Sequence, residues 1–222
     1  ALNLNSLDPA VREASGDVLR FESEESEGGE IGFRSRLFDR SLTLNLTAYR
    51  YIFENQQVQS FNPAIFAFDT TNAGEVTTSG LDVDFLWSTS IRGLSLSGSW
   101  AFLEAEVTGD LFTATGRNLK GRDGGFAPDV SGNIAINWET SISDSLMLRI
   151  SPNFAYKSDY LLGGSSIDPY DPVTNPLGDL EQDSYTTVDL NISLYNPEQA
   201  WRIALIATNL TDEQFLTFAG PA

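Results

Sequence analysis

The stretch NAGEVTTSGLDVDFLW, residues 72–87, changes character in its second half. Apolar Leu81 and Val83 alternate there with acidic Asp82 and Asp84. Because successive side chains of a β-strand point to opposite faces of a sheet, this alternation predicts a strand with one apolar face and one polar face. A soluble sheet with one wet face and the wall of a membrane barrel share this pattern, so the surroundings of the strand must be inferred from the rest of the chain.

Alternation with a period of two recurs along most of the chain, whereas helical periodicity is nearly absent. This pattern predicts an all-β protein. We expect eight strands, at residues 30–38, 41–53, 72–90, 94–107, 130–139, 146–157, 185–195 and 201–210.

The expected connections alternate between short and long. Short turns of the hairpin type lie at residues 38–41, 91–93, 141–145 and 196–200. The other connections are far longer than the usual median of about 4 to 6 residues, and they lie at residues 54–71, 108–129 and 158–184. A sandwich gives no reason for such sorting, whereas an outer-membrane barrel has short periplasmic turns at one rim and long extracellular loops at the other.

The charge balance and the missing residue types exclude several classes of function. The chain has 222 residues, with 13 basic and 31 acidic side chains and a formal net charge of -18. Phosphate binding requires a basic surface, so we expect no nucleic-acid partner. The sequence contains no Cys and no His, which removes thiolate nucleophiles, imidazole bases and the usual zinc sites. No stretch approaches the roughly 18 apolar residues of a transmembrane helix.

No arrangement of side chains in the sequence predicts catalysis. Asp82 and Asp84 share a face and would suit a glycosidase-like pair, but solvated residues of a barrel lumen have the same spacing, and we favour that interpretation. Acidic loops can hold Ca²⁺ through oxygen ligands, yet the motif D-x-[DN]-x-[DN]-G is absent. We therefore expect no enzyme activity, no cofactor and no metal site.

Three tryptophans, Trp87, Trp138 and Trp201, fall close to the short-turn ends of the expected strands. Amphipathic rings gather at the membrane–water interface, where they form the aromatic girdles of outer-membrane barrels. We predict that these residues lie at one membrane interface. The alternative is that they cap the core of a soluble sandwich.

Four segments, in order and at suitable spacing, carry a family resemblance. They are FESEESEGGEIGFRSRLFDRSLTLNLTAYRYIFENQQV (21–58), NAGEVTTSGLDVDF (72–85), LKGRDGGFAPDVSGNIAINW (119–138) and WRIALIATNLTDEQFL (201–216). Together they resemble the C-terminal part of the β-barrel of TonB-dependent outer-membrane receptors. The likeness covers most of the chain after about Val18.

The resemblance implies an antiparallel transmembrane β-barrel wall, about eight strands of a larger, plugged barrel of about 22 strands. Residues 1–222 would form a partial barrel domain, with residues 1–29 as an extracellular loop. The plug and the segment that meets TonB are not in this sequence, and both ends look cut from something longer, so we expect a fragment. The expected location is the outer membrane of a Gram-negative cell, as a multi-pass β-barrel in contact with lipid.

Two sets of site residues follow from this placement. Charged side chains expected to face the lumen are Arg34, Arg36, Asp82, Asp84 and Arg149. Aromatic and amide side chains on the long-loop side, expected to contact a ligand held above the lumen, are Tyr49, Tyr51, Gln56, Phe61, Phe66, Phe112, Tyr160 and Tyr170. Such side chains suit an iron chelate, cobalamin or a sugar alike, so they leave the ligand open.

The function implied by the resemblance is uptake of a scarce solute, such as a ferric siderophore, energised by the TonB complex acting on the plug. One alternative is a porin or adhesin barrel without energy coupling. Another is a secreted β-sandwich that binds carbohydrate.

Overall fold

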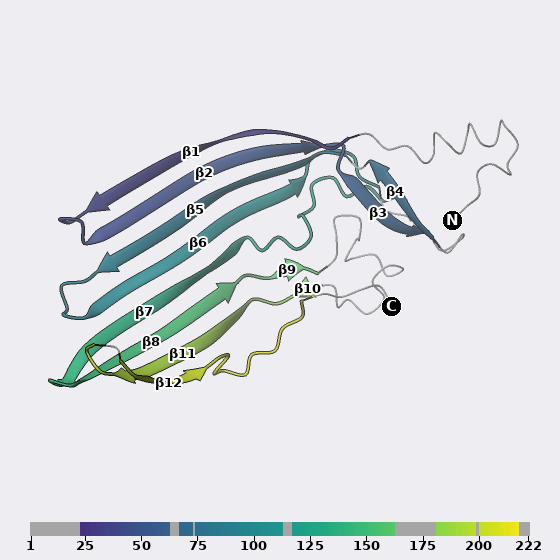
Figure 1. Cartoon of the computed structure of the whole chain (residues 1–222). Coiled ribbons are helices and arrows are strands. Elements are labelled where there is room, and N and C mark those ends of the chain that lie inside the picture. The colour runs from purple at the N-terminus through teal and green to yellow at the C-terminus, as the bar shows by residue number, and fades with distance from the viewer. Residues whose placement is uncertain are drawn as a thin grey trace, which may run out of the picture.

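A computed structural model of the chain describes residues 23–62, 67–72, 74–112, 117–162, 181–198 and 200–217. Eight strands form one antiparallel sheet that curves as a single layer (Figure 1). Their order in the sheet is β1 (Glu25–Leu37), β2 (Leu42–Glu54), β5 (Val76–Ser88), β6 (Leu94–Val107), β7 (Val130–Ser143), β8 (Leu146–Lys157), β11 (Tyr185–Tyr195) and β12 (Arg202–Ala207). No helix in the described part of the chain is long and apolar enough to cross a membrane.

These eight strands confirm the predicted all-β fold, and the single layer argues against a two-layer sandwich. The structure adds four strands outside this sheet that the sequence did not predict. β3 (Gln57–Asn62) pairs with β4 (Ala67–Asn72), and β9 (Tyr160–Leu161) pairs with β10 (Glu181–Gln182). Both pairs belong to the long connections.

The first strand begins earlier than expected. Residues 25–29, which we expected to lie in a loop, continue the ladder with β2, where Glu25 lies opposite Glu54. Their sequence, ESEGG, contains no apolar residue, so alternation could not reveal the extension. Residues 1–22 lie outside the described residues.

One face of the sheet, which we call the apolar face, carries Leu46 and Val83. Leu46 lies opposite both Phe33 and Val83, and Val83 lies opposite Trp100, so apolar side chains continue from strand to strand in register. Many of them are exposed in this single layer, among them Ile31, Phe33, Leu37, Leu81, Trp87, Phe102, Ile134, Trp138, Phe154, Ile203 and Leu205. An exposed apolar surface of this extent marks a contact with a membrane or another apolar partner.

The opposite face, the polar face, carries Asn45 and Asp84, which lie opposite one another. The register continues it through Ser99 on β6 and Asn133 on β7. The result is a sheet with one apolar and one polar side, as in a barrel wall with lipid outside and a wet lumen inside.

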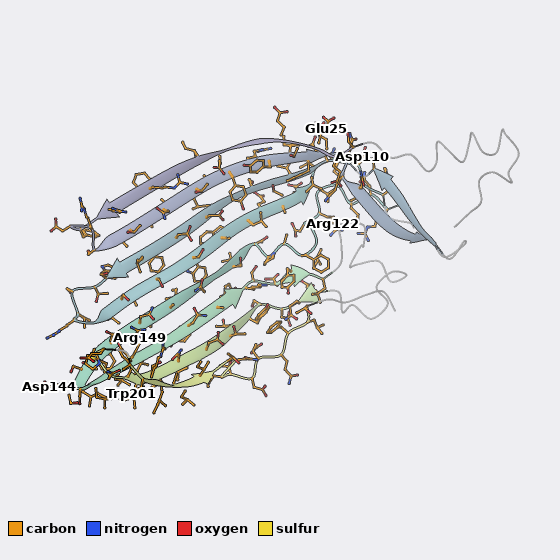
Figure 2. All side chains as sticks on the ribbon, viewed as in Figure 1. Glu25, Asp110, Arg122, Asp144, Arg149 and Trp201 are labelled. Carbon is orange, nitrogen blue, oxygen red and sulfur yellow. The ribbon has the colours of Figure 1, made fainter. Side chains whose placement is uncertain are left out.

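The two ends of the sheet differ as the sequence predicted. The turns β1–β2, β5–β6, β7–β8 and β11–β12 are short and lie at one end, which we call the short-turn end, whereas the long connections lie at the other, the long-loop end (Figure 1). Figure 2 shows Asp144, Arg149 and Trp201 at the short-turn end, and Glu25, Asp110 and Arg122 at the long-loop end.

The buried apolar cluster lies at the long-loop end, where β5 begins and β6 ends. It consists of Val76, Val107, Leu111 and Leu119, each at most 8% exposed. The connection after β6 folds back on that strand, because the amide of Gly121 donates to the carbonyl of Val107 at 2.8 Å. Part of this long connection therefore packs against the ends of β5 and β6.

Gly80 lies within a continuous part of the β5 ladder, with Tyr49 on one side and Leu103 on the other. A Cβ at this position would lie 2.5 Å from the Tyr49 hydroxyl oxygen and 2.6 Å from the Phe102 carbonyl oxygen. The glycine thus leaves room for the tyrosine ring to lie along the polar face.

Candidate functional site

The charged residues predicted for the lumen share the polar face. Arg34 and Arg36 lie on β1, Asp82 and Asp84 on β5, and Arg149 on β8. Their common face follows from the register, since Asn45 on β2 lies opposite both Arg34 and Asp84. That these side chains face the lumen of a barrel stays a prediction.

Arg149 belongs to a polar cluster at the short-turn end. Its Nε donates to Glu139 Oε2 at 2.9 Å, and its guanidinium carbon lies 5.4 Å from the centre of the Tyr195 ring. Both groups of the ion pair are partly exposed, so we expect it to contribute little stability by itself. Sequence reasoning missed Glu139 and Tyr195.

A second polar contact lies beside this cluster, where Arg202 Nη2 donates to the hydroxyl of Ser193 at 2.6 Å. The Ser193 hydroxyl in turn donates to Asn191 Oδ1 at 2.8 Å. Polar side chains of β11 and β12 are therefore held by their neighbours, which gives this part of the wall a fixed arrangement.

The three tryptophans lie at the short-turn end. Trp87 lies opposite Leu42 and Leu96, and Trp138 lies opposite Leu94, next to the turns that join those strands. Trp201 directly precedes β12 and is 46% exposed. Their placement in the fold is compatible with one membrane interface, which stays a prediction.

The aromatic residues predicted to contact a ligand do not form one group. Tyr49 and Tyr51 neighbour each other on the polar face of β2, with ring centres 6.2 Å apart. Phe112 is 60% exposed and lies in the connection after β6, whereas Tyr160 begins β9.

Gln56 and the remaining predicted aromatic residues are likewise spread over different parts of the chain. Gln56 lies between β2 and β3, and its Oε1 is buried without a hydrogen bond among the described residues. Phe61 belongs to β3. Phe66 and Tyr170 lie outside the described residues.

A groove on the polar face, which we call the rim groove, lies near the long-loop end and has a volume of about 550 Å³. Its floor comes from β7, β8 and β11, and one wall comes from Phe215 beyond β12. Its lining residues are Ser131, Gly132, Asn133, Asn153, Ala155, Tyr156, Lys157, Tyr185, Thr187 and Phe215. The predicted ligand contacts include none of these residues, although Tyr160 lies next to Lys157.

Carboxylates gather beside the groove, at the base of the connection after β6. Partial burial and the neighbouring carboxylates of Asp123, Asp159 and Glu104 raise the pKa of Asp129 above its ordinary value of 3.8. Each of these causes disfavours the charged form. No group of three or more side chains suited to a metal ion occurs within the described ranges.

This pKa shift predicts a pH-dependent opening of the long-loop end. The pKa of Asp129 is higher in the folded state than in the open state. Between 3.8 and the raised value, the folded state therefore binds more protons than the open state, and the stability of the folded state falls as the pH rises through this window. The amide of Leu103, which donates to the Asp129 carbonyl at 2.8 Å, reports this opening by hydrogen exchange after correction for the intrinsic rate. We expect Asp129→Asn to remove the pH dependence. Asp39→Asn, at the short-turn end, should leave it unchanged, and an equal effect of both variants would contradict the argument.

Comparison with known proteins identifies the family of the chain. The family model for the TonB dependent receptor-like β-barrel matches residues 7–210. The chain belongs to this family. Barrels of the family are outer-membrane proteins, and its members are transporters and not enzymes.

Individual relatives support the family and limit what can be transferred from it. The metal-pseudopaline receptor CntO of Pseudomonas aeruginosa is 32% identical over 99 residues, which are 45% of this chain and 13% of that receptor. The siderophore receptor PiuA of Acinetobacter baumannii has a TM-score of 0.65 at 19% identity and matches 89% of this chain and 26% of its own. The ferric yersiniabactin receptor FyuA of Yersinia pestis has a TM-score of 0.64 at 18% identity, with the same two coverages of 89% and 26%. This chain therefore spans about a quarter or less of the proteins that it matches.

Proposed function

We propose that this chain is part of the wall of an outer-membrane transporter that takes up a scarce solute, such as a ferric siderophore, with energy from the TonB complex. A plug inside the barrel would pass that energy to the solute. The observation that carries the proposal is the pairing of a continuous apolar face with a charged polar face in a sheet of this family.

The likeness to receptors for metal chelates favours iron or another metal over other solutes. CntO is named as a metal-pseudopaline receptor, PiuA as a siderophore receptor and FyuA as a ferric yersiniabactin receptor. Family membership also favours energised transport over the porin or adhesin alternative. A secreted β-sandwich does not fit a single-layer sheet with an exposed apolar face.

Uptake in cells tests the proposal. The gene for the full-length protein is deleted and restored, and uptake of radioactive iron is measured with a panel of siderophores under iron limitation. We expect deletion to abolish saturable uptake of at least one chelate, and loss of TonB to have the same effect. Cobalamin and sugars serve as alternative solutes.

Two outcomes would contradict the proposal. One is unchanged uptake of every solute after deletion. The other is a change only in the passive entry of small hydrophilic solutes that does not depend on TonB, which would favour a porin.

A further inference from the structure

The rim groove differs in charge from the rest of the chain. Acidic side chains outnumber basic ones by 31 to 13 in the sequence, yet the residues that line this groove include one lysine and no carboxylate. Two further grooves of the polar face each contain an acid, Asp84 in one and, beside Arg92 and Arg149, Glu139 in the other. The carboxylates of Asp129 and Asp159 lie beside the rim groove but do not line it, so it is the lining itself that is suited to a negatively charged group.

Lys157 supplies the positive charge of the groove. It ends β8 on the polar face, where it lies opposite both Ser131 and Tyr185. Its Nζ lies 6.0 Å from the centre of the Tyr160 ring, and within the described residues it forms no ion pair with a carboxylate. Because a lysine ammonium is a flexible point charge, Lys157 can donate hydrogen bonds to an anion in the groove while its stem stays on the wall.

Two stacked rings form the aromatic wall of the groove. The rings of Tyr185 and Phe215 lie 4.4 Å apart at an angle of 4°. A flat, rigid pair of this kind offers a surface on which a planar group can stack at low cost in conformational entropy.

Phe215 reaches the groove because the segment after β12 is fixed at several points. Asn209 accepts a hydrogen bond from the amide of Glu213 at 3.0 Å and donates to its carbonyl at 2.9 Å. The amide of Leu216 donates to Gln182 Oε1 at 2.6 Å. These contacts place the ring before any ligand arrives.

The floor of the groove adds hydrogen-bonding groups. Asn133 Nδ2 donates to Asn153 Oδ1 at 3.0 Å, which fixes both side chains across β7 and β8. The hydroxyl groups of Ser131 and Thr187 line the same floor. A ligand that lies on this floor can therefore be held by hydrogen bonds beneath it as well as by the ring beside it.

We propose that the rim groove binds a planar anionic group of the transported solute, a phenolate, catecholate or aromatic carboxylate. The negative charge would meet Lys157, and the ring would lie against the Tyr185 and Phe215 pair. This inference rests on the proposed transport function and adds to it the chemical class of the recognised group.

Binding to the purified full-length protein in detergent tests the inference, with quenching of intrinsic fluorescence as the readout. The probes are two hexadentate iron(III) chelates, an anionic tris-catecholate and a neutral tris-hydroxamate. The chain has two lysines, so Lys157→Met has a matched control in Lys120→Met, which lies on an exposed turn. Phe215→Ala tests the aromatic wall separately.

We expect the tris-catecholate to bind more tightly than the tris-hydroxamate. Lys157→Met should weaken its binding about tenfold, because a hydrogen bond to a charged group contributes about that factor. Phe215→Ala should weaken binding as well, and Lys120→Met should match the unchanged protein. The lysine effect should shrink at high salt, since salt screens the charge.

Three outcomes would overturn the inference. They are equal binding by Lys157→Met and Lys120→Met, preference for the neutral chelate, and absence of binding by both chelates. Each of these outcomes can be distinguished from a failure of the transport function. If the transported solute is neutral, the uptake assay in cells succeeds while the groove variants have no effect.

Discussion

Replacing Leu46 with arginine is expected to lower the free energy of unfolding of the full-length barrel by about 2–4 kcal/mol. Leu46 lies on the apolar face between Phe33 on β1 and Val83 on β5, near the middle of the apolar part of β2. An arginine there would place its charge in the hydrocarbon core, where no described side chain of opposite sign can meet it.

The adjacent residue provides the matched control. Thr47 lies on the polar face, opposite Asp82. Thr47→Arg introduces the same side chain one residue along the same strand, next to a carboxylate, so we expect a change of at most about 0.5 kcal/mol, as for an ordinary surface substitution. Urea unfolding in lipid vesicles measures both variants. If they lose stability equally, the assignment of the two faces is wrong.

The second large effect is expected at Gly93, in the turn between β5 and β6. Its φ is +76°, a conformation that L-residues with a side chain rarely adopt, and a Cβ would overlap the carbonyl oxygen of Glu139. The left-handed conformation costs about 1–2 kcal/mol, and the overlap adds about 1–3 kcal/mol. We therefore expect Gly93→Ala to destabilise by about 2–5 kcal/mol in total.

Two other glycines separate the cost of the left-handed conformation from the cost of the overlap. Gly121 has a φ of +79°, but the nearest atom to its Cβ would lie 3.9 Å away, so Gly121→Ala should show only the conformational cost. Gly29 has open space around its Cβ and no positive φ, so Gly29→Ala should be nearly neutral. Chemical unfolding of the three variants should rank Gly93 first and Gly29 last. Equal losses for Gly93→Ala and Gly121→Ala would show that the turn relieves the overlap.

The strands of the main sheet could be predicted from the sequence because each has an apolar face that must be buried in lipid or a core. The four strands outside it could not. β9 and β10 have two residues each, which is too few to show a period. In β3, the sequence QVQSFN has only two apolar residues, and its partner β4 has a mixed pattern.

The candidate site was harder to predict than the strands. The groups that form the rim groove come from β7, β8, β11 and the segment after β12, and only the register brings Lys157 beside Tyr185. The partner of Arg149 could not be assigned from the sequence either, because Glu139 lies two residues before the expected turn at residues 141–145 and Arg149 lies four residues after it. A register shift between Ser141 and Ser143 brings the two side chains opposite each other.

The alternation of faces also affects the fidelity of assembly. A slip of β5 by one residue against β2 would keep the backbone ladder but turn Asp82 and Asp84 toward the lipid and Val83 toward water. The same penalty would apply to Arg34 and Arg36 for a slip of β1. The charges of the polar face thus disfavour incorrectly registered sheets during folding, in addition to any role they have once the wall is complete.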